Sequence, residues 1–236
     1  MDRSNFPLLR SLPRVFLDNV PADLDQNPIE LPPKEFDKFR KVLRLNRGDQ
    51  VAVLPGDGRI IRCSYEGKTV VPIETHNLNT QPEKEVILIQ ALPKMDKLEV
   101  IVRMATELGV HKFVLFPSER TVVRWDNKKL QDRINRLKTI ARESAEVGFR
   151  ATLPEIEYHD SLKSVLEKYP ASLVLSEYEN VEKTLSEASS IIVGPEGGWT
   201  SRELKLIGDR SVTLGPRVLR VETAAIAACS ILLCEK

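Results

Sequence analysis

Ile191-Ile192-Val193-Gly194-Pro195-Glu196-Gly197-Gly198 is an apolar run that ends in a glycine-rich loop. A second stretch of the same kind follows, Val212-Thr213-Leu214-Gly215-Pro216-Arg217-Val218-Leu219-Arg220. Each predicts a buried strand and a loop that opens a helix. Ligands of open α/β sheets bind beyond the carboxyl ends of the strands, where backbone N–H groups and helix N-termini are unpaired. We therefore expect the two loops to form opposite walls of one small-molecule pocket.

The first loop has the chemistry of a close backbone approach to a ligand. Gly197 and Gly198 allow positive φ angles, and Thr200 followed by Glu203 is a capping-box pattern that predicts a helix start. The spacing matches neither the dinucleotide-binding fingerprint nor a P-loop. A glycine-rich connection without any ligand is the alternative interpretation.

The second loop leads into a helix over residues 223–233 that is apolar on almost every side. Such a helix is either central to a core or packed against another subunit. We favour a subunit contact that includes Ala228, and a helix that fills its own core is the alternative.

Composition excludes several classes of protein. The 236 residues are 42% hydrophobic and 29% charged, which is typical of a globular chain with one or two domains. No run is apolar enough to span a membrane, and no signal-peptide pattern opens the sequence. The three cysteines form no CxxC motif, so we expect reduced thiols and a cytoplasmic protein. Neither a metal-ligand spacing nor a Gly-x-Ser-x-Gly elbow is present.

The chain changes character near Gln81-Pro82, which predicts two domains, residues 1–80 and 81–236. The first has short strand patterns around a turn at residues 55–58, and one helix over residues 34–45 with Phe36, Phe39 and Leu43 on its apolar face. A small β-barrel that carries a basic helix is the economical interpretation. The second domain alternates strands and helices, which indicates a mainly parallel sheet covered on both faces.

Basic residues gather in two segments although the net charge is only +1. Residues 34–47 contain six of them and residues 124–142 contain seven. Such clusters can supply phosphate contacts to a nucleic acid, and a solvated helix face is the alternative.

Several motifs taken together resemble a known family. Residues 194–199 and 214–224 closely resemble the signature of the RsmE-type 16S ribosomal RNA uridine-N3 methyltransferases, which belong to the SPOUT superfamily. The resemblance extends to Val42-Leu43-Arg44, Leu92-Pro93-Lys94 and Ser118-Glu119-Arg120, and it spans nearly the whole chain.

The resemblance implies an α/β fold with a SPOUT-type parallel sheet, a C-terminal trefoil knot and a small N-terminal PUA-like β-barrel domain. It also implies a homodimer that binds S-adenosyl-L-methionine and modifies 16S ribosomal RNA, either free or assembled in the 30S subunit, without membrane or metal. The residues that match the cofactor loops are Leu175, Ser176, Glu177, Gly194, Pro195, Glu196, Gly197, Gly198, Leu214, Gly215, Val218, Leu219, Arg220 and Thr223.

Methylation at uridine N3 requires the loss of a proton and stabilisation of negative charge on the uracil oxygens. We assign the charge-stabilising role to Arg220 and proton acceptance to Glu196 or Glu222, with a loop clamp and helix capping as the respective alternatives. Phosphate contacts are expected from Arg10, Lys38, Lys41, Arg44 and Arg124. Trp199 or Phe149 can stack on a base, but packing is the favoured role for both.

The chain also departs from the family pattern. Val147 and Phe149 stand where the family has glutamine and glycine, Met95 replaces a glycine, and Phe39 replaces a frequent histidine. Two rival interpretations remain: a SPOUT enzyme that methylates transfer RNA bases or ribose oxygens, and an RNA-binding assembly factor with a vestigial pocket.

Overall fold

The computed structural model describes residues 6–22, 27–77, 79–123, 125–177 and 185–234. The chain divides into two compact units. The first comprises Met1–Gln81 and Ala145–Leu153, and the second comprises Pro82–Ser144 and Pro154–Lys236. No helix in the described part of the chain combines the length and the apolar character that crossing a bilayer requires.

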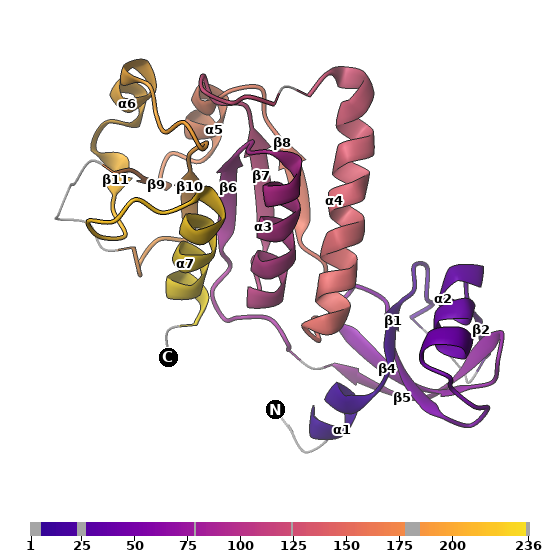
Figure 1. The fold of residues 1–236 in the computed structure, drawn as a ribbon. Coiled ribbons are helices and arrows are strands. Elements are labelled where there is room, and N and C mark those ends of the chain that lie inside the picture. The colour runs from indigo at the N-terminus through magenta and orange to yellow at the C-terminus, as the bar shows by residue number, and fades with distance from the viewer. Residues whose placement is uncertain (1–5, 23–26, 78, 124, 178–184, 235–236) are drawn as a thin grey trace. The chain divides into compact units, whose positions relative to one another are not determined.

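The first unit is built on a curled five-stranded sheet (Figure 1). Its strand order is β1-β3-β4-β5-β2, with β1 parallel to β3 and the other neighbours antiparallel. The strands are β1 (Arg14–Phe16), β2 (Ile29–Glu30), β3 (Gln50–Leu54), β4 (Arg59–Tyr65) and β5 (Thr69–Asn77). The predicted hairpin at residues 55–58 joins β3 to β4, as expected.

Helix α1 (Phe6–Ser11) precedes the sheet, and the predicted basic helix forms as α2 (Pro33–Asp37) followed by one π-helical turn, Lys38–Val42. Phe39 is fully buried against Tyr65 in the core of this unit. The prediction for Leu43 was wrong, because its side chain is 41% exposed. The wider π turn changes the angular position of the residues that follow it, so Leu43 leaves the apolar face.

The end of helix α4 (Asn127–Val147) and the residues after it belong to the first unit. Glu146 accepts hydrogen bonds from the Phe16 N–H at 3.1 Å and from the Lys38 ammonium at 2.6 Å. Phe149 has a φ of 54° and is buried in an apolar cluster, with the guanidinium of Arg14 4.9 Å from its ring centroid. This left-handed backbone suits the glycine of the family pattern, and here packing of the phenyl ring offsets the strain. Phe149 therefore packs in the core, as favoured.

The second unit contains a six-stranded sheet in which every neighbouring pair is parallel, in the order β11-β9-β10-β6-β7-β8. The strands are β6 (Ile87–Ala91), β7 (Lys112–Phe116), β8 (Glu155–Tyr158), β9 (Leu173–Leu175), β10 (Ser190–Val193) and β11 (Ser211–Val212). The helices are α3 (Met95–Leu108), α4, α5 (Leu162–Lys168), α6 (Ser201–Ile207) with a 3₁₀ turn Gly208–Arg210, and α7 (Val221–Leu233).

Both faces of this sheet are covered, which explains its continuous apolar strands. Successive residues point to opposite faces, so Leu88 packs in the cluster that contains α3 and α7, whereas Ile89 packs in the cluster that contains α5 and α6. Figure 1 shows α3, α4 and α7 together on one side of the sheet. This confirms the parallel α/β fold expected from the sequence. Threading of the C-terminal part into a trefoil knot stays a prediction.

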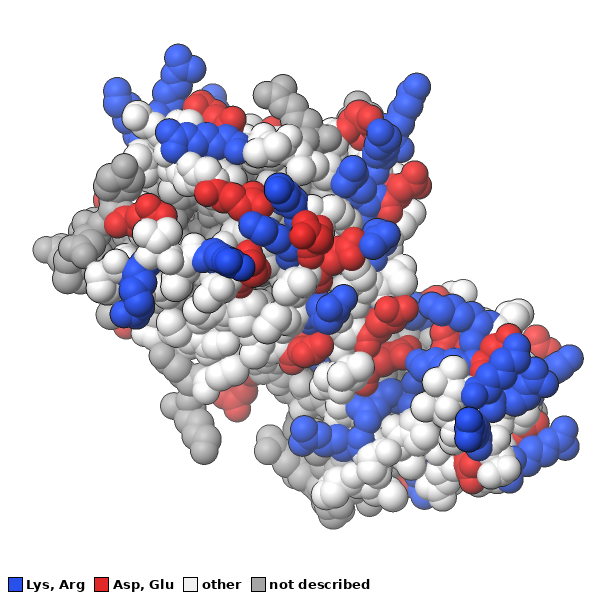
Figure 2. All heavy atoms as spheres, viewed as in Figure 1, with Lys and Arg blue, Asp and Glu red and all other residues white. Residues whose placement is uncertain are grey.

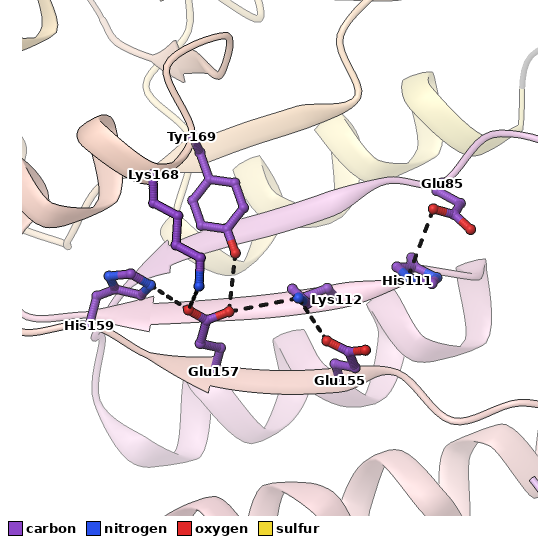
Figure 3. A network of polar contacts seen from close by, with 8 residues as sticks. All are labelled: Glu85, His111, Lys112, Glu155, Glu157, His159, Lys168 and Tyr169. Atoms are coloured by element: carbon purple, nitrogen blue, oxygen red, sulfur yellow. Dashed lines mark hydrogen bonds and ion pairs between the residues drawn. The ribbon is translucent and has the colours of Figure 1, made fainter.

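Strand β8 is an edge strand that the sequence analysis did not identify. Its Glu157 carboxylate contacts Lys112 of β7, His159, Lys168 and Tyr169 (Figure 3). Burial alone would raise the pKa of Glu157, but the hydrogen bonds from Lys168, His159 and Tyr169 outweigh it and lower the pKa to about 2. The network ties α5 and its C-terminal end to the edge of the sheet.

Helix α7 corrects the expectation for Ala228. Val221, Ala225, Ala228, Cys229 and Leu232 are buried in the core of the same unit, where α7 lies against α3 and the sheet. The helix has one face in its own core, and Ala228 lies on that face rather than in a subunit contact. The remaining residues of the helix are partly exposed.

Candidate functional site

Three loops meet at one end of the parallel sheet because they follow three neighbouring strands. Strand β9 ends at Leu175, β10 at Val193 and β11 at Val212, and the sheet order places β9 between the other two. The carboxyl ends of parallel strands share one edge of the sheet, so the loops after them are adjacent. They surround a cavity of about 510 Å³.

Almost every residue predicted to bind the cofactor lines this cavity. The lining includes Leu175, Ser176 and Glu177 after β9, Gly194, Pro195, Glu196, Gly197 and Gly198 after β10, and Leu214, Gly215, Val218, Leu219 and Arg220 after β11. Thr223 is exposed on α7 and does not line the cavity. Both glycine-containing loops thus line one cavity, and binding of a small molecule there stays a prediction.

Two glycines of the loop after β10 lie so close to neighbouring side chains that a larger residue would crowd them. A Cβ atom at Gly194 would lie 3.0 Å from Cε2 of Trp199, and one at Gly197 would lie 3.2 Å from Cβ of Arg120. Gly198 has a φ of +66°, a conformation that side-chain-bearing residues rarely adopt. The loop therefore needs glycine for packing as well as for its backbone path.

Buried side chains support the same loop from behind. The amide of Gln90, fully buried on β6, donates to the carbonyl oxygens of Ala91 at 2.9 Å and Gly194 at 3.3 Å. The indole N–H of Trp199 donates to the Leu175 carbonyl at 2.8 Å, and its ring stacks on Phe116 at 6.5 Å between centroids. Trp199 is buried and packs in the core, as favoured, and it also contributes to the cavity lining.

Helix α6 begins where the sequence predicted. The Thr200 hydroxyl accepts from the Glu203 N–H at 3.2 Å, and the Glu203 carboxylate accepts from the Thr200 N–H at 2.9 Å. This reciprocal pair is a capping box, which satisfies two of the unpaired donors at the helix start.

Glu196 is tied to helix α3. Its carboxylate lies 3.2 Å from the ammonium of Lys97 and accepts from the Lys94 N–H at 3.3 Å. Burial alone would raise the pKa of Glu196, but the hydrogen bonds from Lys94, from its own N–H and from Lys97, together with the Lys97 charge, lower it. Glu196 is therefore a carboxylate that stays ionised at neutral pH.

The other two candidate catalytic residues differ in position. Arg220 lines the cavity, immediately before α7. Glu222 lies in the first turn of α7 and does not line the cavity, and its Oε2 atom is buried with no hydrogen-bond partner among the described residues.

Four polar or charged residues line the cavity but were not predicted from the sequence to do so: Lys97, Arg120, Thr213 and Arg217. Arg217 lay inside the quoted loop, so its position was a signal. Lys97 and Arg120 come from the segments after β6 and β7, whose ends share the same edge of the sheet. Their Leu-Pro-Lys and Ser-Glu-Arg surroundings were noted only as parts of the family pattern.

Some of the basic residues expected to contact phosphate already form ion pairs within the protein. Arg10 and Arg44 are exposed, and Lys41 is exposed but paired with Asp37 at 2.9 Å. Lys38 is paired with Glu146, and Arg124 lies outside the described residues. Figure 2 shows Lys and Arg side chains gathered over the face of this unit that carries α2.

A family model described as an RNA methyltransferase domain matches residues 80–233. The unit that contains the parallel sheet and the cavity thus falls in the class of RNA methyltransferases. The chain is 32% identical to the ribosomal RNA small subunit methyltransferase E of Bacillus subtilis, over 92% of this chain and 94% of that protein. It is 30% identical to the protein of the same name from Synechocystis, over 89% and 74% of the two chains. The chain belongs to the ribosomal RNA small subunit methyltransferase E family.

Solved structures agree with this assignment. A methyltransferase structure from Legionella pneumophila, described as a complex with the bound cofactor SAM, aligns with a TM-score of 0.83 at 25% identity, covering 94% of this chain and 96% of that one. The ribosomal RNA small subunit methyltransferase E of Neisseria gonorrhoeae, described as bound to S-adenosyl methionine, has the same fold, with a TM-score of 0.80 at 24% identity over 93% and 95% of the chains.

Proposed function

We propose that this protein transfers a methyl group from S-adenosyl-L-methionine to N3 of a specific uridine in 16S ribosomal RNA of the small subunit. The observation that carries the proposal is the cavity walled by the loops after β9, β10 and β11, in a chain of this family. The relatives' names specify the RNA of the small subunit, and the similar structures are described with the cofactor bound.

The cavity residues fit that cofactor. The cavity volume lies within the range of small-molecule sites. The glycines of residues 194–198 carry no side chains that would separate the loop backbone from a ligand, which suits close contact with the polar edges of an adenosine. When bound, the cofactor supplies a methyl group that its sulfonium already activates, so the reaction requires no metal. Among the described residues, no group of three His, Cys, Asp or Glu side chains could hold one.

The protein must then remove the N3 proton of uridine and stabilise the charge that develops. Arg220 lines the cavity and can hold a uracil oxygen through its guanidinium. Of the two candidate carboxylates, only Glu196 lines the cavity, and its lowered pKa keeps it in the form that accepts a proton. Glu222 serves better as a negative charge in the first turn of α7.

The first unit is proposed to bind the RNA through phosphate contacts. Arg10, Lys41 and Arg44 are exposed and are the candidates that remain accessible, whereas Lys38 is held by Glu146. Contacts of this kind position an RNA without reading its sequence. They allow the target nucleotide to be turned out into a pocket.

A homodimer in the cytoplasm completes the proposal. One face of α7 is buried in its own core, so the contact with a second copy would use the partly exposed residues on the rest of the helix, such as Ala227. Sedimentation equilibrium tests this directly. A mass equal to one chain at micromolar concentration would contradict it.

Nucleoside mass spectrometry of 16S ribosomal RNA tests the reaction itself. We expect 3-methyluridine to disappear in a strain that lacks the gene and to return when the wild-type gene is supplied. As a matched control, the deletion strain receives the gene for the Gly194→Val variant, whose side chain would occupy the space next to Trp199. Persistence of 3-methyluridine in the deletion strain would contradict the proposal.

Calorimetry separates the rival functions. An assembly factor with a vestigial pocket would give no heat with S-adenosyl-L-methionine. A transfer RNA or ribose methyltransferase would bind it but leave 3-methyluridine in 16S RNA unchanged.

A further inference from the structure

Arg120 lines the cavity, but it belongs to none of the three loops and has no role in the proposed mechanism. It follows strand β7, is exposed, and lines the cavity from a wall that none of the three main loops provides. Its Nη1 atom donates to the Gly197 carbonyl at 2.8 Å. The side chain therefore lies across the glycine loop at the rim of the cavity.

A buried carboxylate fixes the chain next to Arg120. Glu203 is only 3% exposed, and its two oxygens accept from different backbone segments. Oε1 accepts from the Glu119 N–H at 3.0 Å and Oε2 accepts from the Thr200 N–H at 2.9 Å. The ring closes through the Thr200 hydroxyl, which donates to the Glu119 carboxylate at 2.7 Å.

This ring does more than cap a helix. A capping box requires only the reciprocal bonds between Thr200 and Glu203. Burying a carboxylate is costly unless hydrogen bonds compensate it, and here one of the two compensating donors comes from the residue before Arg120. The arrangement holds residues 119–120 against the start of α6.

The charges around the cavity leave Arg120 available for a ligand. The lining carries the cations Lys97, Arg120, Arg217 and Arg220 and the carboxylates Glu177 and Glu196. Glu196 is paired with Lys97. Within the described ranges no carboxylate forms an ion pair with Arg120, and a guanidinium has five N–H donors, of which one is used on Gly197.

We propose that Arg120 binds a phosphate oxygen of the RNA substrate at the rim of the cavity, and that Glu203 is its positioning residue. The inference rests on the proposed function. An exposed arginine with a fixed backbone is suited to phosphate because its planar fork matches phosphate oxygens in a bidentate manner. A contact at the rim holds the backbone beside a nucleotide that has been turned into the cavity.

Steady-state methylation of unmodified 30S subunits by Arg120→Ala tests the contact. We expect the KM for subunits to rise about 10-fold or more, since a charge-assisted hydrogen bond is lost. The dissociation constant for S-adenosyl-L-methionine should change by a much smaller factor, because the glycine loop keeps its bonds from Gln90 and Lys94. The slope of log KM against log potassium chloride concentration should fall by about 0.7 to 0.9, the contribution of one phosphate contact. Arg202→Ala on the exposed side of α6 is the matched control and should leave the KM for subunits, the dissociation constant for the cofactor and the salt slope unchanged.

Two further variants test the positioning role. Arg120→Lys keeps the charge and should retain the salt slope with a smaller rise in KM. Glu203→Gln should raise KM for subunits alone, yet add little to Arg120→Ala in the double variant, because it acts through Arg120.

Three results would overturn the inference. Weaker binding of S-adenosyl-L-methionine with an unchanged KM for subunits would assign Arg120 to the cofactor. An unchanged salt slope would exclude a phosphate contact. Additive effects of the two substitutions would exclude Glu203 as the positioning residue. Failure of the proposed function is separate, because the wild-type protein itself would then leave the subunits unmethylated.

Discussion

The two glycine-containing loops that wall the cavity differ in what holds them. Residues 194–198 receive hydrogen bonds from Gln90, Lys94 and Arg120, each on another part of the second unit. Residues 214–220 are held locally: in the described part of the chain, Thr213 and Gly215 bond to each other and the Arg220 carbonyl accepts from the Ala224 N–H of α7 at 2.8 Å. Val218 in this loop is 77% exposed.

The wall formed by residues 194–198 is ordered by bonds to other elements when the protein folds. Among the described residues, the wall formed by residues 214–220 is held only by bonds to residues close in the sequence. A loop bonded to several elements has its conformational entropy removed when the protein folds, so binding does not incur that cost again. A loop with few tertiary bonds retains freedom that a ligand must remove. We therefore expect substitutions behind the first wall to affect stability, and substitutions in the second to affect stability little.

The largest effect is expected for Trp199→Ala. The substitution removes a buried ring that stacks on Phe116 and leaves the Leu175 carbonyl without its donor. Urea unfolding should show a loss of about 3–5 kcal/mol. Trp199→Phe keeps an aromatic ring and should lose less. A loss below about 1 kcal/mol for the alanine variant would contradict the view that the fold holds this wall.

Gln90→Leu comes next. It keeps approximate volume but removes the buried amide donor to the Gly194 carbonyl. We expect a loss of about 1–3 kcal/mol in the free energy of unfolding, together with weaker binding of S-adenosyl-L-methionine by calorimetry. Unchanged values of both would show that the loop does not depend on strand β6.

Lys97→Met should have a smaller and pH-dependent effect. The pKa of Glu196 is lowered in the folded protein, so its ion pair stabilises above the ordinary carboxyl pKa and this contribution is lost as the pH falls through the folded value. The variant should be about 0.2–1 kcal/mol less stable than the wild type at pH 7. The two proteins should converge as the pH falls below the ordinary carboxyl range and Glu196 becomes protonated. A constant difference across this range would contradict the role of the pair.

Val218→Ala in the second wall should have the smallest effect. Its side chain is exposed, so the free energy of unfolding should change by no more than about 0.5 kcal/mol in the same urea assay. A loss comparable with that of Gln90→Leu would remove the distinction between the walls.

Local patterns made much of this structure predictable. The capping box at Thr200 and Glu203 spans four residues, and the alternating strands and helices of the second unit reflect burial on both faces of the sheet. Strand β8 was missed because it is short and carries two glutamates, as an edge strand can. Ala228 was misplaced because an apolar helix does not reveal which of its faces its own core covers.

The part of the site that sequence could not reveal depends on distant partners. Glu203 was expected as a cap, but its bond to the Glu119 N–H joins residues that are 84 positions apart. Arg120 reaches the cavity only because β7 ends at the same edge of the sheet as β10. Glu222 and Thr223 matched the family pattern, yet the first turn of α7 places them outside the cavity lining.

The salt-bridged edge strand β8 has a consequence for how copies of the protein behave at high concentration. An unpaired strand edge is a template on which another chain can add its own strand. Here Glu155 and Glu157, joined to Lys112, place charges along that edge, and the opposite edge strand, β11, has only two residues. Both edges of the sheet are therefore poor templates for fibril growth, even without a helix that covers them.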